Sequence, residues 1–303
     1  MPTLGPGRRV RVQVPATSAN LGPAFDAAGL ALGLFDEVEV ETTPAGCTVE
    51  VSGEGADDLP RDEAHLVVRA VREGLRAVGA DQPGLRLRAI NRIPHGRGLG
   101  SSAAATVAGL LAARGLCADD LPGLDDRQVL ALAIGFEGHG DNVAACLHGG
   151  LSLVWVEGTT PRVVRVPLHP SVVPVVLVPS TELSTDRARG LLPESVPHRV
   201  AAHAAGRAAL LVHALGERPD LLLAATEDRL HQPYRASAFP ESMAVVRSLR
   251  DGGHAAVISG AGPSVLVLAT RESAGSVPVV GGWARLEPGV ASRGAQVSQV
   301  VAA

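Results

Sequence analysis

Residues 94–105 hold the densest group of backbone and hydroxyl groups that could bind an anion. Three glycines alternate at positions 96, 98 and 100, and Ser101 and Ser102 follow just before an apolar run from Thr106 to Ala113. The run predicts a helix, whose first-turn N–H groups and positive dipole end favour an anion. Glycine lets a bulky oxyanion approach the backbone closely. The segment predicts a phosphate-binding loop, although a glycine-rich turn that merely caps a buried helix would look similar.

Two common phosphate-binding motifs are excluded. The glycine spacing is neither that of a G-x-G-x-x-G dinucleotide turn nor that of a G-x-x-x-x-G-K-[ST] loop. The chain contains no lysine, so all 27 of its Lys and Arg residues are arginine. This removes the P-loop lysine, the protein-kinase strand lysine and Schiff-base chemistry together. Phosphate transfer by this chain would need positive charge from backbone dipoles, arginine and a metal ion.

A second polar group lies in the loop that we expect to begin at Ala16, after a strand at residues 10–14. Asn20 and Asp26 are its candidate side chains. They could make local Asx-turn bonds to the backbone. They could also face a ligand, with Asp26 accepting hydrogen bonds from a substrate ammonium or hydroxyl group.

A third group, Glu-Gly-His-Gly-Asp-Asn at residues 137–142, lies between two apolar helical runs. A solvated turn between helices would account for it. The alternative is a site for a hard cation, because Mg²⁺ takes few protein oxygens and keeps its other positions for water and phosphate. Glu137 with Ser102 would suit Mg²⁺. A lone histidine, His139, without a cysteine pair does not suit zinc.

Arginines and a small-residue turn in the second half complete the candidates. Arg189 and Arg235 could form surface ion pairs, or they could bind a carboxylate in bidentate fashion. Together with Asp26 they would make a clamp for an amino acid, in which guanidinium binds carboxylate and carboxylate binds ammonium. Residues 259–264, Ser-Gly-Ala-Gly-Pro-Ser, fit either a tight hairpin or a second wall beside the phosphates.

Composition narrows the class of protein. With 303 residues and 46% apolar residues, the chain can form two modest domains. A formal charge of −4, no basic run and only 2% aromatic residues argue against nucleic-acid binding. Three cysteines without metal-type spacing indicate reduced thiols and a cytoplasmic protein. We find no targeting segment and no apolar stretch of about 18 residues, so we expect no membrane span.

The pattern of elements predicts an α+β fold in both halves. The strand at residues 47–51 is expected to form a hairpin with the strand before it. A change to Gly, Thr and Pro near residues 157–162 predicts a domain boundary. Periodicity predicts strands at residues 10–14, 30–34, 37–42, 47–51, 85–90, 151–156, 172–178, 255–259 and 265–269, and helices at 63–78, 106–113, 127–136, 143–147, 199–215, 219–229 and 241–251.

Taken together, these motifs resemble the GHMP small-molecule kinases, and among them the homoserine kinase family. The family's V-P-A-[ST]-S-A-N-L-G-P-G-F-D matches residues 14–26 except that Ala24 replaces a glycine, and its E-G-H-P-D-N matches residues 137–142 except that Gly140 replaces a proline. Residues 94–104 and 259–264 resemble the other signatures, and Thr185, Arg189 and residues 192–197 also resemble the family's sequence. The resemblance covers roughly residues 10 to 270.

The resemblance implies a fold and an activity. It implies an ATP-binding domain like ribosomal S5 domain 2 at residues 1–160 and a ferredoxin-like domain at residues 161–303, with the active site between them. It implies transfer of the γ-phosphoryl group of ATP, with Mg²⁺, to the side-chain hydroxyl of L-homoserine in threonine biosynthesis. The expected partners are these small molecules and not nucleic acid or a membrane; a homodimer is possible.

It also implies residue roles. Ser102 and Glu137 would hold Mg²⁺. The resemblance does not assign the adenine contacts, for which His65 and Leu66 are candidates only because they stand before an apolar helical run. Homoserine would be bound by Asn20, Asp26, Thr185, Arg189 and Arg235. The phosphates would lie against Pro94, His95, Gly96, Arg97, Gly98, Leu99, Gly100, Ser101, Ser102, Ala103 and Ala104.

The catalytic candidates are His139, Asp141 and Asn142. Asp141 is the sequence candidate for a general base, because related kinases use an aspartate. The homoserine kinase family instead implies an asparagine, here Asn142, beside the hydroxyl and no strong base, which is the version we favour. A loose phosphoryl-transfer transition state allows it, since the alcohol can keep its proton until late.

Two alternatives stay open at this point. The first is a GHMP kinase that acts on mevalonate, a sugar or a shikimate-like acid. A sugar kinase would have no use for Arg189 and Arg235 paired with Asp26. The second is a nucleotide-binding regulator without catalysis, against which the presence of both Ser102 and Glu137 argues.

Overall fold

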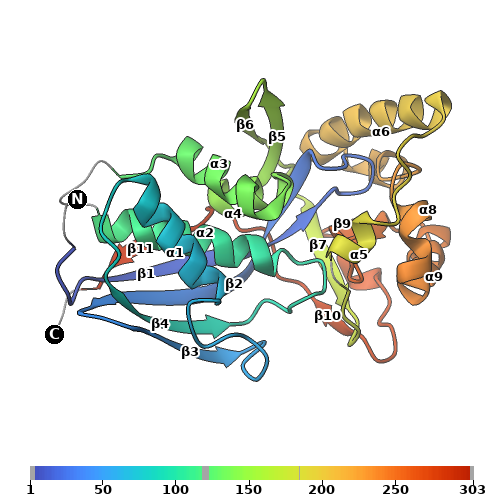
Figure 1. The fold of residues 1–303 in the computed structure, drawn as a ribbon. Helices are drawn as coiled ribbons and strands as arrows, with labels where there is room; N and C mark the ends of the chain where they lie inside the picture. Colours follow the sequence, from blue (N-terminus) through green and yellow to red (C-terminus); the bar gives the residue numbers. More distant parts are fainter. Residues whose placement is uncertain (1–3, 118–122, 184, 301–303) are drawn as a thin grey trace.

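The computed structural model describes residues 4–117, 123–183 and 185–300, without the side chains of residues 185 and 186. Two sheets form two lobes that lie side by side (Figure 1). The larger sheet contains β11 (Gln296–Gln299), β1 (Arg9–Ala19), β2 (Ala28–Thr43), β4 (Gly84–Asn91) and β3 (Cys47–Gly53) in that order, with β5 (Leu151–Glu157) paired to β2 and β6 (Thr160–Val166) paired to β5.

β1 is longer than the sequence predicted. The expected loop from Ala16 is wrong at its start, because residues 16–19 continue the strand and pair with residues 29–32 of β2. The register shifts between Pro15 and Ala16, which is where a residue without an N–H group can be accommodated in a strand. The extension carries Thr17 and Ser18 to the phosphate loop, since the Thr17 N–H donates to the Leu99 carbonyl at 2.9 Å.

The predicted hairpin at residues 47–51 is also wrong. β3 pairs in parallel with β4, while β4 pairs antiparallel with β2 and so lies between the two. Parallel neighbours need a crossover connection, and α1 (Leu66–Ala77) supplies it. Sequence alternation identified the strand but could not choose its partner.

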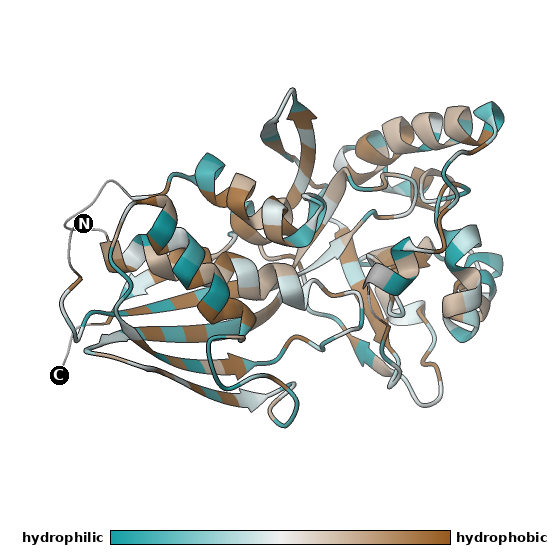
Figure 2. Ribbon diagram, viewed as in Figure 1, coloured by the Kyte–Doolittle hydropathy of each residue, from teal (hydrophilic) through white to brown (hydrophobic). Residues whose placement is uncertain are grey.

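Helices cover one face of the larger sheet. α1 packs on α2 (Ser101–Cys117), and α2 in turn packs on β1 and against α3 (Asp126–Glu137) and α4 (Asp141–His148) (Figure 1). Apolar residues accordingly dominate α2 in Figure 2, and nearly all of its residues are buried. The predicted helices at 106–113, 127–136 and 143–147 are confirmed.

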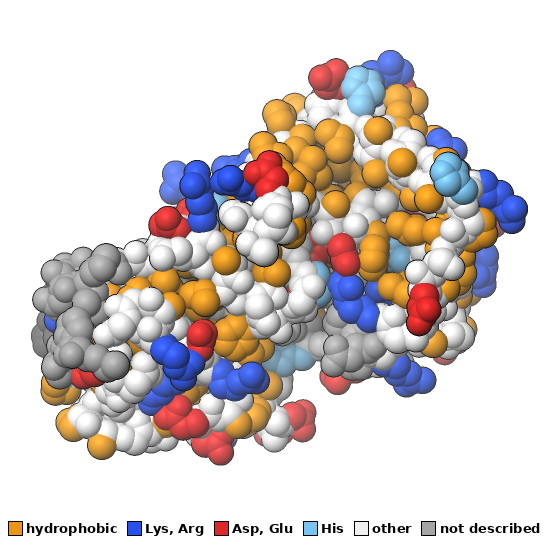
Figure 3. Space-filling view, turned by 45° about the horizontal axis from the view of Figure 1, so that its top comes forward, with side chains coloured by type: hydrophobic (Ala, Val, Ile, Leu, Met, Phe, Trp, Pro, Cys, Tyr) orange, Lys and Arg blue, Asp and Glu red, His pale blue; other side chains and the backbone are white. Residues whose placement is uncertain are grey.

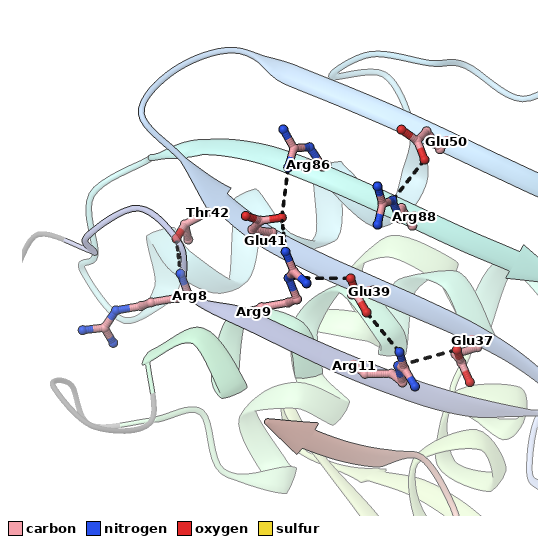
Figure 4. A network of polar contacts seen from close by, with 10 residues as sticks. All are labelled: Arg8, Arg9, Arg11, Glu37, Glu39, Glu41, Thr42, Glu50, Arg86 and Arg88. Atoms are coloured by element: carbon pink, nitrogen blue, oxygen red, sulfur yellow. Dashed lines mark hydrogen bonds and ion pairs between the residues drawn. The ribbon is translucent and has the colours of Figure 1, made fainter. Parts of the chain in front are cut away.

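The opposite face of the same sheet is charged. Figure 4 shows cross-strand pairs between arginines of β1 and β4 and glutamates of β2 and β3. Val38 and Val40 alternate with these glutamates and point into the core. One face thus builds the core and the other meets water.

The smaller sheet has the strand order β10 (Ala284–Leu286), β7 (Val172–Val178), β9 (Val265–Thr270), β8 (Ala256–Ile258), and every neighbouring pair is antiparallel. In chain order this is 4-1-3-2, the arrangement of a ferredoxin-like split βαβ unit. The expected ferredoxin-like half is therefore confirmed. Its connection from β9 to β10 carries only the short η3 turn (Ala274–Ser276).

Helical segments surround the smaller sheet and reach the junction with the larger one. The predicted helix at 219–229 is wrong beyond Ala225, because the Thr226 hydroxyl donates back to the Leu222 carbonyl at 2.8 Å and Asp228 then caps the next helix. The segments are α5 (Thr185–Arg189), α6 (His198–Gly216), η1 (Pro219–Leu221), α7 (Leu222–Ala225), α8 (Gln232–Arg235), η2 (Ala236–Ala238) and α9 (Pro240–Asp251).

The chain crosses between the lobes more than once. β6 straddles the predicted boundary at residues 160 and 161, and β11 returns to the larger sheet beside β1. The exact division stays a prediction. Across the described residues, no helix has the combined length and apolar character needed to traverse a bilayer.

Neighbouring residues on β4 should respond very differently to substitution. Leu87 is 1% exposed in the core, whereas the Arg88 side chain is 55% exposed and pairs with Glu50. We expect Leu87→Ala to lower the free energy of unfolding by about 2–5 kcal/mol. Arg88→Gln should change it by less than about 1 kcal/mol, because exposed ion pairs contribute little. Urea unfolding measures both, and equal losses would contradict the one-sided core.

Candidate active site

One cavity of about 170 Å³ collects residues from both halves of the chain. It lies where the first turn of α2 meets the turn between β8 and β9. Figure 3 shows basic, acidic and histidine side chains close together between the two lobes. The cavity is lined by Asn20, Asp26, Gly96, Gly98, Gly100, Ser101, Ser102, Ala103, Glu137, His139, Asp141, Asn142, Leu183, Arg189, Arg235, Gly260 and Ala261.

The glycine loop can reach this cavity only because two of its residues have no side chain. Gly98 and Gly100 have φ of 72° and 71°, in the left-handed region. A Cβ on Gly98 would lie 2.2 Å from the Ser259 carbonyl oxygen, and one on Gly100 would lie 2.0 Å from Thr17 Oγ1. The loop is therefore packed tightly between residues 14–26 and residues 259–264, and it leads directly into the N-terminus of α2.

Four residues of the predicted loop line neither this cavity nor the second one described below. They are Pro94, Arg97, Leu99 and Ala104. Leu99 and Ala104 are buried in the core. The Arg97 guanidinium donates to the carbonyls of Pro179 and Ser180 at 3.0 and 2.9 Å, so it holds the loop against the chain after β7.

Ser102 and Glu137 are adjacent, as the cation hypothesis required. Ser102 Oγ donates to Glu137 Oε1 at 2.7 Å, and Thr106 Oγ1 donates to the same oxygen at 3.0 Å. Among the described residues, no hydrogen bond engages the other carboxylate oxygen of Glu137. A hydroxyl and a carboxylate are hard oxygen donors, so this pair fits Mg²⁺ that shares its remaining positions with phosphate and water.

His139, Asp141 and Asn142 meet at the start of α4. Asp141, only 2% exposed, accepts through Oδ1 from the Asn142 N–H and from His139 Nδ1, both at 2.8 Å. Burial alone would lower the pKa of His139, but the hydrogen bond and charge of Asp141 outweigh it and raise that pKa. One oxygen of the candidate base is thus already engaged twice.

Asp26 and Arg189 form a bidentate ion pair across the cavity. Arg189 NH2 and NH1 donate to Asp26 Oδ1 and Oδ2 at 2.6 and 3.1 Å. Both side chains keep about a third of their surface exposed, at 36% and 33%. The pair joins residues 163 positions apart, and its exposure leaves it open to a competing ligand. Thr185 begins α5, but its side chain lies outside the described part of the chain.

Arg235 is instead almost fully buried, at 2% exposure. Its Nε donates to the Ala188 carbonyl at 3.1 Å, and its guanidinium lies 5.2 Å from the centre of the Phe25 ring. Within the described residues no carboxylate pairs with it. Burial and the nearby charge of Arg189 lower the pKa of Arg235. A buried cation without a carboxylate, facing a cavity, is suited to an anionic ligand group.

His231 supports this arrangement. Its Nε2 donates to the Gly22 carbonyl at 2.8 Å, and its Nδ1 lies 3.5 Å from Arg235 NH1. Its ring also lies 5.1 Å from that of Phe25. Burial lowers the pKa of His231, which keeps the ring neutral beside the guanidinium.

The loop at residues 20–26, between β1 and β2, has a strained backbone. Of the non-glycine residues that the structure describes, only Asn20, Leu21 and Asp26 have positive φ, at 67°, 47° and 55°. Asn20 fixes the loop, because its Oδ1 accepts from the Asp26 N–H at 2.9 Å and its Nδ2 donates to the Gly260 carbonyl at 3.0 Å. Strain of this kind concentrates at functional sites, where the surrounding structure holds it in place.

A second, more apolar cavity of about 210 Å³ shares Ser101 and Ser102 with the first. His65 and Leu66 line it, together with Val14 and Val38 of the sheet. His65 Nδ1 accepts from the Val67 N–H at 3.3 Å, so the ring proton is on Nε2, which is buried without a partner in the described structure. This cavity therefore offers a largely apolar slot beside the start of α2.

Sequence reasoning missed several residues around the main cavity, among them Leu183, which lines it, and Thr106, which donates to Glu137. Thr17 contacts Asn142, while Phe25 and His231 contact Arg235. Phe25 and Thr17 lie inside the first motif, where their position was a signal. His231 precedes Arg235 by one helical turn, but nothing in its sequence context indicated a role.

Comparisons with known proteins agree with this geometry. Residues 65–150 match the protein family described as "GHMP kinases N terminal domain", and residues 204–277 match the family described as "GHMP kinases C terminal". The two lobes thus carry the two domains of a GHMP-type kinase. A solved mevalonate diphosphate decarboxylase from Enterococcus faecalis shares this fold at 13% identity and a TM-score of 0.70, covering 97% of this chain and 99% of that one.

More similar relatives narrow the family. A homoserine kinase of Streptomyces avermitilis is 55% identical over 97% of this chain and 97% of its own length. A solved homoserine kinase from Cytophaga hutchinsonii has a TM-score of 0.83 and 28% identity, covering 96% of this chain and 98% of that one. The chain belongs to the homoserine kinase family, which confirms the resemblance of its motifs.

The packing of Gly100 predicts that even one added methyl group disables the enzyme. We expect Gly100→Ala to lower kcat/KM at least about 10²-fold, because a displacement of roughly 1 Å in a positioned loop has such an effect. Steady-state kinetics measures it. Gly135→Ala is the matched control, since that helical glycine has open space around it. Normal activity of Gly100→Ala would contradict the tight contact with Thr17.

Proposed function

We propose that this chain transfers the γ-phosphoryl group of ATP to the side-chain hydroxyl of L-homoserine and forms O-phospho-L-homoserine, a step in threonine biosynthesis. It is an enzyme of the phosphotransferase class with an alcohol as acceptor. One observation carries the proposal. A single cavity is lined by the glycine loop, by the Ser102–Glu137 pair, and by one acidic and two basic side chains, which is the charge pattern that complements an amino acid.

ATP would lie across the two cavities. The N–H groups around Gly98 to Ser102 and the dipole of α2 would bind the phosphates. The adenine would enter the apolar cavity, which His65 and Leu66 line. Ser101 and Ser102 line both cavities, so a nucleotide can bridge them.

Ser102 and Glu137 would hold Mg²⁺. When bound, the ion neutralises charge on the β- and γ-phosphate oxygens. Glu137 is already oriented for this by two hydroxyl donors, Ser102 and Thr106. Because the chain has no lysine, the bound cation, the dipole of α2 and the arginines would supply the positive charge of the site.

When homoserine binds, its charged groups would replace the ion pair between Asp26 and Arg189. Its carboxylate would meet the fixed guanidinium of Arg235 and the movable one of Arg189, while its ammonium would take Asp26. Asn20 holds the loop that carries Asp26. His139 and Asn142 line the same cavity, and the reacting hydroxyl would lie beside them.

The base-free version of the reaction is favoured by the contacts of Asp141. This carboxylate accepts two hydrogen bonds on one oxygen and is paired with His139, so its first role is to hold the start of α4. Positioning and charge stabilisation then supply the catalysis, as expected for a loose transition state. The cytoplasmic location and the possible homodimer stay predictions.

A substrate panel tests the function. In an ATP-dependent coupled assay we expect L-homoserine to exceed 4-hydroxybutyrate and 3-aminopropan-1-ol in kcat/KM by roughly 10³-fold, because the first compound lacks the partner of Asp26 and the second lacks the partner of the buried Arg235. Galactose and mevalonate should be inactive. If either of these were the better acceptor, the proposed substrate would be wrong.

Asp141→Asn tests the role of the carboxylate. Asparagine keeps the acceptor oxygen but removes the charge, so we expect kcat to fall by less than about 10³-fold, or roughly 4 kcal/mol. The pKa of His139 should drop below its ordinary value, because burial then prevails. NMR titration of the histidine ring measures this shift. A larger loss of kcat in a folded variant would indicate a true base.

A further inference from the structure

The end of β1 reaches the reacting part of the site through one side chain, Thr17. This residue is fully buried, at 0% exposure. Its hydroxyl donates to Asn142 Oδ1 at 2.8 Å, across 125 residues of sequence. Its backbone N–H donates to the Leu99 carbonyl, which ties it to the phosphate loop as well.

This bond decides which edge of the Asn142 amide faces the substrate. A carboxamide carries an acceptor oxygen on one side and two N–H donors on the other. Because Thr17 occupies the oxygen, the NH₂ group is the part of the amide left for the cavity that Asn142 lines. A donor can orient a hydroxyl oxygen or bind a phosphoryl oxygen, but it cannot accept a proton.

The surrounding packing keeps the pair in place. The Asn142 N–H donates to Asp141 Oδ1 at 2.8 Å and fixes the backbone. Gly100 covers the side chains, since a Cβ there would lie 2.0 Å from Thr17 Oγ1 and 3.0 Å from Asn142 Oδ1. The phosphate loop, Thr17 and Asn142 are therefore in direct contact.

We propose that Thr17 is a positioning residue for phosphoryl transfer, which holds Asn142 so that its NH₂ group faces the reacting hydroxyl. The inference rests on the proposed function and adds to it that Asn142 acts as a donor only. It gives the base-free reaction a structural cause. The proton of homoserine cannot pass to Asn142. It stays on the attacking oxygen while the new O–P bond forms and the bond to the ADP leaving group breaks, and it then passes to an oxygen of the transferred phosphoryl group or to water.

Two substitutions test Thr17, of which Thr17→Val keeps nearly the same volume and Thr17→Ser keeps the hydroxyl. Thr17→Val removes the hydroxyl and frees the amide to rotate, so we expect kcat to fall roughly 10- to 100-fold, somewhat less than the loss of a whole transition-state donor. KM for ATP and for homoserine should stay within about twofold. Thr17→Ser should keep at least about half of kcat. Thr42→Val is the control, because Thr42 is equally buried and hydrogen-bonded but distant from the cavity.

A double-mutant cycle separates positioning from structure. In an Asn142→Ala background, Thr17→Val should cause no further loss of kcat, since its effect passes through the amide. Equal losses in both backgrounds, or a change confined to KM, would overturn the proposal. Urea unfolding of each variant checks the fold.

Asn142→Asp tests the donor assignment without changing Thr17. A carboxylate can still accept from Thr17 but presents an acceptor to the cavity, so kcat should fall at least as far as in Asn142→Ala. Wild-type activity of Asn142→Asp would overturn the assignment. Absence of any homoserine phosphorylation by the wild-type protein would instead refute the proposed function, so the two failures are distinguishable.

Discussion

The whole site depends on close backbone contact at Gly98. Only a residue without a Cβ fits beside the Ser259 carbonyl, and that contact brings the phosphate loop of one lobe against the β8–β9 turn of the other. Ser259 Oγ reinforces it by hydrogen bonds to the Gly98 carbonyl at 2.7 Å and to Ser18 Oγ at 2.8 Å. Three segments far apart in the sequence thus share one buried junction.

This junction links the proposed nucleotide and acceptor sites. The β8–β9 turn also accepts a hydrogen bond from Asn20 through the Gly260 carbonyl, and Asn20 in turn holds the backbone of Asp26. A change in the phosphate loop therefore reaches Asp26, the proposed partner of the ammonium group, through only a few short contacts. Since the turn belongs to the smaller sheet, the relative position of the two lobes sets the shape of the cavity.

The sequence predicted the helices, the strands and the residues of the cavity better than it predicted which strands pair with each other. Alternating or helical spacing located most strands and helices, and the polar motifs identified the residues that line the cavity. Pairing partners were not predictable, because β3 has the same alternation whether it joins β2 or β4. Thr17, Phe25 and His231 were missed because their roles arise from contacts 125 or more residues away, or from burial. Asn20, by contrast, was identified from the sequence. Its side chain makes the expected local bond to the Asp26 N–H, and it also lines the cavity.

The charges of the cavity explain why an amino acid suits it better than a neutral alcohol. Arg235 is buried and held by a carbonyl and an aromatic ring, so it is the fixed part of the clamp. Asp26 and Arg189 are partly exposed and satisfy each other, so they are the part that can open. In the proposed function the substrate carboxylate compensates the charges of Arg235 and Arg189, and the substrate ammonium compensates the charge of Asp26. A sugar would leave the buried guanidinium without an anion, and burying an uncompensated charge is strongly unfavourable. Selectivity then follows from electrostatic balance in addition to shape.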